Sequence, residues 1–411
     1  MQEPYDVAVV GGGMAGAILA WALRREGLTV CLLERGAPPG SDPAPGDPER
    51  VSALGAGSRG ILEGLGLWDR IEGFGPEPVT AIEVTDGTGG GGALLTAAEA
   101  GVPALGQVTP NRALVAAAWE CLREDGEAGL FPSSTVTGVE WGRHCVRLKV
   151  DHAGTERILT TRLVVGADGE HSRIREAAGI GTWGWHHNRY ALVATVAAER
   201  PLRGRAFERF LPEGPLAFLP LGGRAASIVW TLPPSEAVDL QELEEGSFLA
   251  RLRERLGPVL GRLEAVGGRA LNPLELRLAR RFTGARLALV GNAGHLLHPV
   301  AAQGFNLGLR DVATLAGEAG KARRRGWDPG SPAVLERYAQ HRRGDTARVV
   351  AFTEGLNRLF ANDLEPLGVL RRLGLRALHR SGPLKRALME QAMGRVPGQG
   401  EARPLWEKVQ P

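Results

Sequence analysis

The sequence predicts a mixed α/β fold, in which two domains are interleaved along the chain and a helical region follows at the C-terminus. Three observations support this: a strand, glycine turn, helix and strand at the N-terminus, a β-rich stretch at 185–232, and helical patterns that dominate after residue 305. A chain of 411 residues also exceeds what one ordinary hydrophobic core supports. Because the two kinds of segment alternate, each domain must be assembled from separate parts of the chain.

The N-terminal segment has the pattern of a Rossmann-like, dinucleotide-binding unit. Residues 5–10 are typical of a buried strand, and Gly11, Gly13 and Gly16 fit G-x-G-x-x-G before a helix. The first glycine permits a tight turn, the second lets the backbone approach a pyrophosphate, and the third lets the helix pack on the strand. Glu34 ends the next strand, where a carboxylate can accept hydrogen bonds from an adenosine ribose. Together these features predict a dinucleotide site.

Composition excludes several classes of protein. The formal net charge of +3 gives no field that argues for a nucleic-acid partner. The three cysteines form neither a disulfide framework nor a metal-like cluster, so we expect no metal and a reduced, cytoplasmic setting. Residues 7–23 are uncharged, but acidic residues precede them and arginines follow, the reverse of a signal peptide. We therefore expect a protein that is soluble or peripheral to a membrane.

The elements that follow are expected from periodicity. Arg50 stands before a stretch, 51–67, whose apolar residues have helical spacing, and on composition alone it is a solvated loop charge. Residues 79–95 predict a hairpin with a glycine-rich tip. The remaining expectations are helices at 111–124 and 247–263 and strands at 134–141, 145–151 and 157–165.

Two further glycine motifs come later in the chain. Gly166 and Gly169 enclose Asp168 at the end of a strand, before a short helix. In residues 285–318 a strand ends in Gly291, Asn292 and Ala293, and a loop from His298 to Gln303 leads into a long helix opened by Gly304, Asn306 and Gly308. Exposed amides at such a helix start suit a group that becomes anionic, such as a reduced isoalloxazine ring.

With these motifs in order, the chain resembles the class A FAD-dependent aromatic hydroxylases from about residue 5 to 360. The matching segments are the N-terminal glycine motif, GADGEHSRIR at 166–175 and VGNAGHLLHPVAAQGFNLGLRD at 290–311. More narrowly it is similar to the ubiquinone-biosynthesis hydroxylases, through RVSAL at 50–54 and NRAL at 111–114. ALGQV at 104–108 and GRAFERF at 204–210 look most like the 2-polyprenyl-6-methoxyphenol hydroxylase branch.

The resemblance implies a domain plan and a cofactor site. A Rossmann-like FAD domain of the GR2 type would comprise 1–75, 101–180 and 276–330, a β-sheet substrate domain 76–100 and 181–275, and a helical region 331–411. Gly11, Gly13, Gly16 and Glu34 would bind the ADP half of FAD. The other cofactor-binding positions implied are Arg50 and Arg112 near the flavin and pyrophosphate, Asp168 on the pyrophosphate side, Asn292 near the ribityl chain, and Pro299, Gly304, Asn306 and Gly308 along the flavin ring.

The implied reaction is hydroxylation of a polyprenylated phenol in ubiquinone biosynthesis. NAD(P)H would reduce FAD, O2 would add to give a C4a-hydroperoxyflavin, and one oxygen atom would pass to the ring beside Pro299 and Arg50. His298, with His295, is a candidate for removing the phenol proton. The alternative for the His298–Pro299 pair is that it only shapes the loop.

The basic stretch 364–396 suggests a contact outside these motifs. It carries seven Arg or Lys residues against two acids, interleaved with Leu and Met. Such a stretch could sit on the inner face of the plasma membrane or on other ubiquinone-biosynthesis proteins, and the alternative is a solvated helical face.

Other functions remain open at the level of sequence. They are hydroxylation at another ring position or of another phenol, an NAD-linked dehydrogenase, a flavin halogenase or geranylgeranyl-type reductase, and a non-catalytic FAD-binding assembly or regulatory protein. A simple dehydrogenase leaves the motif at 285–318 unexplained, and a W-x-W-x-I-P segment, expected of a halogenase, is absent from the sequence.

Overall fold

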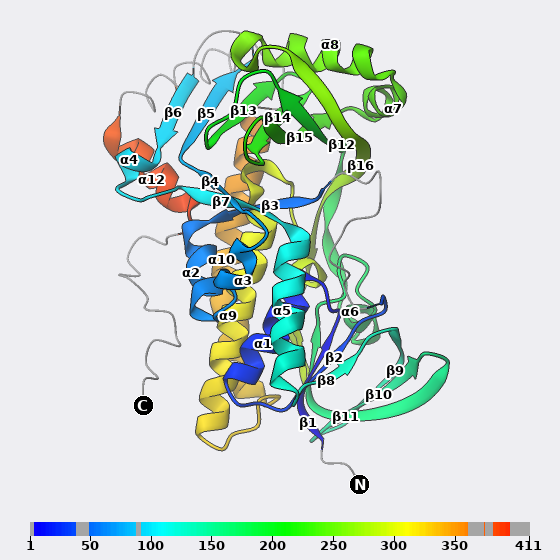
Figure 1. Ribbon diagram of the computed structural model, residues 1–411. Helices are drawn as coiled ribbons and strands as arrows, with labels where there is room; N and C mark the ends of the chain where they lie inside the picture. The colour runs from blue at the N-terminus through cyan, green and yellow to red at the C-terminus, as the bar shows by residue number, and fades with distance from the viewer. Residues whose placement is uncertain (1–3, 38–48, 88–91, 361–373, 375–380, 395–411) are drawn as a thin grey trace.

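The first sheet forms the lower half of the molecule in Figure 1 and is parallel at its centre. The computed structural model describes residues 4–37, 49–87, 92–360, 374 and 381–394. The sheet has the order β17-β18-β11-β1-β2-β8, and β9 and β10 extend it as an antiparallel ribbon from β11. Its strands are β1 (Tyr5–Val10), β2 (Val30–Leu33), β8 (Gly129–Phe131), β9 (Ser134–Trp141), β10 (Val146–His152), β11 (Thr155–Gly166), β17 (Thr283–Gly284) and β18 (Leu287–Leu289).

Long helices pack beside this sheet and bury most of the core. α1 (Met14–Arg25) contacts both α5 (Asn111–Asp125) and α9 (Gln303–Arg324), and α10 (Pro332–Phe360) packs on α9. The strands β1 and β2 and the last four residues of β11 are almost continuously buried, as expected where a parallel sheet is covered by helices. Ile18, Leu23, Trp119 and Tyr338 are among the buried side chains of this core.

The second sheet forms the upper half and is mostly antiparallel (Figure 1). Its order is β19-β16-β12-β15-β14-β13-β5-β6, so the β5–β6 hairpin joins the sheet through β5, which pairs with β13 more than a hundred residues later in the chain. This pairing supports the proposed assignment of 76–100 and 181–275 to one domain. The strands are β5 (Ala81–Asp86), β6 (Gly92–Thr96), β12 (Thr182–Ala198), β13 (Arg205–Leu211), β14 (Gly214–Pro220), β15 (Ala225–Leu232), β16 (Leu263–Ala279) and β19 (His295–Leu296).

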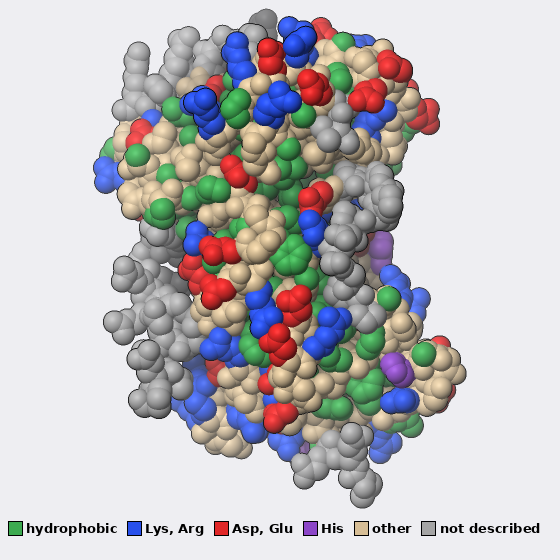
Figure 2. Space-filling view, viewed as in Figure 1, with side chains coloured by type: hydrophobic (Ala, Val, Ile, Leu, Met, Phe, Trp, Pro, Cys, Tyr) green, Lys and Arg blue, Asp and Glu red, His purple; other side chains and the backbone are tan. Residues whose placement is uncertain are grey.

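Smaller elements connect the two halves. A third sheet has the order β3-β7-β4, formed by β3 (Val51–Gly55), β7 (Gly106–Pro110) and β4 (Glu77–Val79). The remaining helices are α2 (Ala56–Gly64), α3 (Trp68–Glu72), α4 (Ala97–Ala100), α6 (Arg173–Ala177), α7 (Pro234–Glu242), α8 (Glu245–Leu256) and α12 (Gly382–Ala392), with 3-10 turns η1 (Pro258–Leu260), η2 (Gly291–Ala293) and η3 (Val300–Ala302). Figure 2 shows acidic and basic side chains intermixed over the face it presents.

The mixed α/β class is confirmed, and two element boundaries were wrong. The helix expected at 51–67 begins only at Ala56, because Val51–Gly55 pairs antiparallel with β7. The helix expected at 247–263 ends at Leu256, since Gly257 adopts a φ of +78° and leaves the helical conformation. The predicted hairpin is present as β5 and β6, with 88–91 outside the described residues. Within the described chain, no helix combines the length and apolar character needed to cross a membrane.

Candidate active site

The N-terminal glycine turn lies at the carboxyl end of β1, between β2 and β11. Gly11 has a φ of +105°, and a Cβ at this position would overlap the carbonyl oxygen of Ala167. A Cβ at Gly16 would overlap the carbonyl oxygen of Gly11, so α1 can approach the strand only with glycine there. A Cβ at Gly13, in contrast, would meet no atom within 4 Å. Gly11 and Gly16 therefore serve the packing of the turn, and Gly13 faces open space.

The first turn of α1 offers unpaired amides to an anion. Its N-cap is Gly13, which supplies no side-chain hydrogen bond, and no acidic residue lies in the first turn. The amides of a helix start need partners, and a phosphate beside them satisfies both their hydrogen bonds and the positive end of the helix dipole. Gly13, Met14 and Ala15 all line the cavity described below. This end of the cavity therefore fits a pyrophosphate.

Glu34 lies at the end of β2, beside the glycine turn. Its carboxylate accepts hydrogen bonds from the amide of Gly12, at 2.5 Å, and of Gly36, at 2.8 Å. Trp119 of α5 donates its indole hydrogen to the carbonyl oxygen of Gly12 at 2.9 Å, which fixes the turn from the other side. The half-buried carboxylate is thus held where a ribose bound along the turn would meet it.

Asp168 organises the loop between β11 and α6. Its carboxylate accepts hydrogen bonds from the hydroxyl of Ser172, at 2.5 Å, and from the amide of Ile174, at 3.2 Å. Its neighbours Ala167 and Gly169 line the cavity, whereas Asp168 itself does not. Asp168 therefore stabilises the loop by accepting hydrogen bonds at the start of α6. Only its two neighbours in the chain line the cavity.

The two predicted arginines lie next to each other but away from the cavity wall. The amide of Asn111 donates to the carbonyl oxygen of Arg50 at 2.9 Å, and this contact joins the start of α5 to β3. The Arg50 side chain is exposed. The guanidinium of Arg112 pairs with Glu49 at 2.7 Å and lies 5.3 Å from the centre of the Phe74 ring. Neither arginine is among the described residues that line the cavity.

The loop before α9 brings the third glycine motif to the cavity beside the first turn of α1, where a Cβ at Gly291 would lie 3.2 Å from that of Ala15. Gly291 has a φ of +58°, and Asn292 is exposed to the cavity. Ala301 and Ala302 are both left-handed, with φ of +58° and +50°, which is strained for residues that carry a Cβ. A Cβ at Gly304 would meet nothing within 4 Å, and α9 has no side-chain N-cap. The start of α9 therefore presents open amides to a flat or anionic group.

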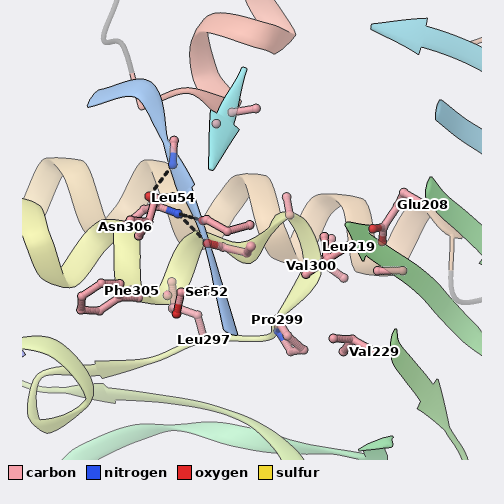
Figure 3. Close-up of a pocket in the computed structure, with 18 of the residues that line it drawn as sticks. Ser52, Leu54, Glu208, Leu219, Val229, Leu297, Pro299, Val300, Phe305 and Asn306 are labelled. Carbon is pink, nitrogen blue, oxygen red and sulfur yellow. Dashed lines mark hydrogen bonds between the residues drawn. The ribbon is translucent and has the colours of Figure 1, made fainter. Parts of the chain in front are cut away.

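Asn306 holds this loop against β3 and α2. Its side-chain oxygen accepts hydrogen bonds from the amide of Gly55, at 2.9 Å, and the hydroxyl of Ser58, at 2.6 Å. Its nitrogen donates to the carbonyl oxygens of Ala53, at 2.9 Å, and Ala302, at 2.7 Å. Figure 3 shows Asn306 and hydrogen bonds that it makes to other lining residues. All four hydrogen-bonding capacities of the amide are thus used, three with backbone groups and one with the hydroxyl of Ser58.

A buried ionic cluster lies beneath the same loop, and the sequence interpretation did not find it. Asp311 accepts hydrogen bonds from the amide of Gly291 at 2.9 Å and from Arg342 at 2.6 Å, and its other neighbour is His295. Burial would raise the pKa of Asp311, but His295 and Arg342 outweigh it and hold that pKa below its usual value. Arg342 also pairs with Asp345 at 2.7 Å. The cluster fixes the end of β18 to α9 and α10.

His298 is buried behind the loop and does not line the cavity. Its Nδ1 atom accepts a hydrogen bond from the amide of Val300 at 3.2 Å, and its ring packs edge-on against His187 with 5.0 Å between centres. Burial, assisted by His187, lowers the pKa of His298 to about 3, so the ring is neutral at physiological pH. This placement favours the interpretation that the His298–Pro299 pair shapes the loop, while Pro299 lines the cavity.

One cavity of about 1070 Å³ is shared by the first and third glycine motifs. The starts of α1 and α9 border it, with Gly13, Asn292 and Gly304. Other parts of its wall are apolar: the second sheet contributes residues such as Phe207 and Leu219, α10 and α12 contribute Leu356, Leu388 and Met389, and Met393 follows α12. α12 is fixed over the cavity by Lys385, which pairs with Glu99 of α4 at 2.8 Å.

The residues present fit FAD. Two uncapped helix starts face one cavity, and two glycines leave open space there, at Gly13 and Gly304. The first start suits the pyrophosphate and the second the isoalloxazine ring, whose reduced form is anionic. The apolar remainder of the cavity has room for an aromatic ring and an attached chain beside the flavin.

Comparisons with known proteins agree with this geometry. The FAD binding domain family matches residues 4–353. The chain is 41% identical over 393 residues to the ubiquinone hydroxylase UbiL of Rhodospirillum rubrum, covering 95% of this chain and 89% of that protein. It is 34% identical to the 3-demethoxyubiquinol 3-hydroxylase of Escherichia coli K12, covering 95% of this chain and 99% of that one.

A solved structure shows the same fold. The p-nitrophenol 4-monooxygenase PnpA from Pseudomonas putida DLL-E4 has a TM-score of 0.78 at 20% sequence identity, with 96% of this chain and 99% of that chain covered. At this identity the likeness shows the architecture alone, and the sequence relatives show the family. The chain belongs to the FAD-dependent monooxygenases of the ubiquinone-biosynthesis hydroxylase family, and FAD is its cofactor.

Proposed function

We propose that this enzyme hydroxylates the aromatic ring of a polyprenylated phenol, 2-polyprenyl-6-methoxyphenol, in ubiquinone biosynthesis. The observation that carries the proposal is the cavity, which runs from two cofactor-binding helix starts to an apolar end formed by leucines and methionines. A polar ring with a long isoprenoid chain matches a cavity with one polar end, and methionines adapt to a flexible chain. The names of the relatives UbiL and 3-demethoxyubiquinol 3-hydroxylase support the same class of substrate.

The proposed arrangement places FAD across both glycine motifs. The ADP half would lie along Gly11, Gly13, Gly16 and Glu34, with Arg50, Arg112 and Asp168 shaping the surrounding loops, and the flavin would lie against Asn292, Pro299, Gly304, Asn306 and Gly308. When bound, FAD supplies the electron transfer from NAD(P)H to O2 and the activated oxygen atom. The chain's own contribution is to orient the phenol ring and to keep water out of the apolar cavity.

A second candidate is hydroxylation at another position of the ring. The Escherichia coli relative, at 34% identity over nearly the whole chain, is named for action on 3-demethoxyubiquinol. The cavity accommodates either ring, because the two substrates share the prenyl chain and differ in small ring substituents.

We also propose that the stretch 364–396 contacts a membrane surface, from which a prenylated substrate would enter. Of this stretch the structure describes residue 374 and residues 381–394. In α12, Arg386 is exposed, and Leu384 is 51% exposed although it also lines the cavity, as do the buried Met389 and, just after the helix, Met393. Co-sedimentation with anionic liposomes, with and without residues 364–411, tests this: equal binding of both forms would contradict it.

The substrate is tested by lipid analysis of a strain that lacks this enzyme. The proposal expects 2-polyprenyl-6-methoxyphenol to accumulate and ubiquinone to be lost, with recovery when the gene is restored. Accumulation of 3-demethoxyubiquinol would favour the second candidate. An unchanged quinone profile would contradict both.

A further inference from the structure

Glu208 is the feature of the cavity that the proposed function leaves unexplained. It lies on β13 and lines the cavity, and among the described lining residues it is the only one with an ionisable side chain. The other polar side chains there are amides and hydroxyls, namely Ser52, Gln107, Thr231, Asn292 and Asn306. A single carboxyl group in a cavity lined mainly by apolar side chains requires a reason, because desolvating a charge is costly.

The position of Glu208 is fixed by the register of the sheet. It pairs with Val84 of β5 and with Ala217 of β14, both of which also line the cavity. Ala206 and Phe210, two residues away on the same strand, face the same side. Figure 3 shows the carboxylate directed away from the sheet, toward the side of the cavity where Val300 and Pro299 lie.

The carboxylate of Glu208 has no hydrogen-bond or ion-pair partner within the described part of the chain. Glu208 is half-buried, and because mainly apolar side chains line the cavity around it, its carboxylate is partly desolvated. This desolvation raises the pKa of Glu208 to about 7. A half-buried acceptor that lacks a protein partner among the described residues is complementary to a ligand that donates a hydrogen bond.

The two arginines on the same strand as Glu208 are engaged elsewhere. Arg205 pairs with Glu83 of β5 at 3.2 Å, and Arg209 donates to the carbonyl oxygen of Leu256 at 2.5 Å. The titratable and charged side chains on the elements packed around this face are Asp86 of β5, His187 of β12, Glu354 and Arg358 of α10, Lys385, Arg386 and Glu390 of α12, and His298 in the loop before α9. Burial is the cause of the raised pKa of Glu208, and no charged neighbour contributes to it.

We propose that Glu208 binds the phenol hydroxyl of the substrate and accepts its proton while the ring is hydroxylated. The inference rests on the proposed function, since it requires a phenol in the cavity. Ionisation makes the ring carbons ortho and para to the oxygen more electron-rich, and these carbons are the ones attacked by an electrophilic oxygen atom. A base whose pKa lies near the working pH is suited to such a transfer.

The proton balance closes within one turnover. The phenolic O–H bond breaks, its electron pair stays on oxygen, and the proton binds a carboxylate oxygen of Glu208. A ring carbon then forms its bond to the oxygen atom that the monooxygenase reaction supplies, which leaves a carbonyl at the former phenol. When that carbon loses its hydrogen as a proton to water, the ring electrons return the carbonyl to an oxyanion, and Glu208 gives its proton back.

The test compares Glu208→Gln with the wild-type holoenzyme on a soluble 2-prenyl-6-methoxyphenol that carries one isoprene unit. Glutamine keeps the shape but cannot accept a proton. We expect kcat/KM for hydroxylation to fall by about 100-fold or more while NAD(P)H oxidation continues, so that coupling is lost. The wild-type rate should rise with pH through about 7, whereas the E208Q rate should be flat.

Two controls separate proton transfer from structure. Glu83→Gln, on the adjacent strand and outside the cavity lining, should keep both the coupling and the pH profile. Glu208→Asp should keep part of the hydroxylation rate that E208Q loses, and its rate should again rise with pH. The inference would be overturned if E208Q formed as much hydroxylated product per NAD(P)H as the wild type and its rate still rose with pH in the same way.

A direct spectroscopic measurement distinguishes failure of this inference from failure of the proposed function. Infrared difference spectra of the holoenzyme should show a carboxylic acid band that titrates near pH 7, is absent in E208Q, and shifts when the prenylated phenol is added. Loss of the shift in the wild type would overturn the role of Glu208. A band that shifts in an enzyme that hydroxylates none of the prenylated phenols would instead contradict the proposed substrate.

Discussion

The Nε2 atom of His295 lies 2.6 Å from the Oδ2 atom of Asp311, and both side chains are fully buried. The same carboxylate oxygen accepts the amide hydrogen of Gly291, which begins the turn η2 after β18 and lines the cavity. Through this contact a buried ionic cluster on α9 and α10 sets the position of the third glycine motif. Its integrity is therefore expected to matter for both stability and FAD binding.

Asp311→Asn should destabilise the protein by about 3 kcal/mol, because the buried Arg342 would lose one of its two carboxylate partners and keep only Asp345. Urea unfolding of the FAD-free protein measures this. Since the folded-state pKa of Asp311 is depressed, the stabilisation is present at neutral pH and is lost as pH falls through that pKa. Arg343→Ala removes an exposed pair with Glu336 and should cost less than about 1 kcal/mol. Equal effects of both changes would contradict the role of the cluster.

Substitutions of the glycine turn should separate folding from cofactor binding. Gly16→Ala places a Cβ against the carbonyl oxygen of Gly11, so both stability and FAD affinity should fall, the former by about 1–3 kcal/mol or more. In Gly13→Ala the added Cβ meets only open space, so the free energy of unfolding of the FAD-free protein should stay within about 1 kcal/mol of the wild-type value. The affinity for FAD should nevertheless fall at least about tenfold.

Gly60→Ala is the matched control for these two variants. A Cβ at Gly60 meets nothing within 4 Å, and this helical glycine lies outside the cavity lining, so FAD affinity should not change. Fluorescence titration of the FAD-free variants measures affinity. A Gly13→Ala variant that binds FAD as tightly as wild type would show that the pyrophosphate lies elsewhere.

Asn306→Asp should weaken the loop before α9. The carboxylate loses the two donors that hold the carbonyl oxygens of Ala53 and Ala302, and it places negative charge beside them. The free energy of unfolding should fall by about 2 kcal/mol or more, and FAD affinity should fall with it. Ser58→Ala removes one hydrogen bond to the same side chain and should cost about 1 kcal/mol. If the two variants were equally stable, Asn306 would not be the organising residue.

His298 should make the protein less stable in mild acid. The pKa of the buried ring is lowered to about 3, so the unfolded state binds a proton more readily as pH falls below about 6.5. The contribution of the neutral His298 ring to the free energy of unfolding is thus fully present above pH 6.5. It declines by up to about 1.4 kcal/mol per pH unit as the pH falls toward 3.

Urea unfolding between pH 7 and pH 4.5 measures this loss as the slope of the free energy of unfolding against pH. His298→Asn should reduce that slope. The slope that remains should include His187, whose pKa burial also lowers. A His298→Asn variant with the wild-type slope would contradict the buried, neutral state of this ring.

Local patterns in the sequence predicted the fold class and the positions of the glycine motifs, because the chemistry of those motifs is contained in a few neighbouring residues. The strand at 51–55 was missed since its partner is β7, more than fifty residues later, and helical spacing of Leu54 with Ile61 and Leu65 was the stronger local signal. The cluster of Asp311, His295 and Arg342 was missed for the same reason, because its members meet only after α9 and α10 pack.

Glu208 shows a signal that the sequence did contain. It lies in the segment GRAFERF, where the strand pattern places it on the same face as Ala206 and Phe210. A charged residue on the apolar face of a predicted strand is unusual enough to suggest a binding site. What the sequence could not show is that this face borders the same cavity as Pro299 and the start of α9, because that depends on how the two sheets meet.

The measurement that tests the central claim most directly is hydroxylation of a prenylated phenol by the purified FAD-bound enzyme under ¹⁸O2. The account predicts that, with NAD(P)H present, one ¹⁸O atom enters the ring for each NAD(P)H oxidised, and that the phenol accelerates NAD(P)H oxidation. A phenol that is recovered unchanged, with NAD(P)H oxidised at the same rate in its absence, would contradict the claim that this cavity holds a phenol beside the flavin.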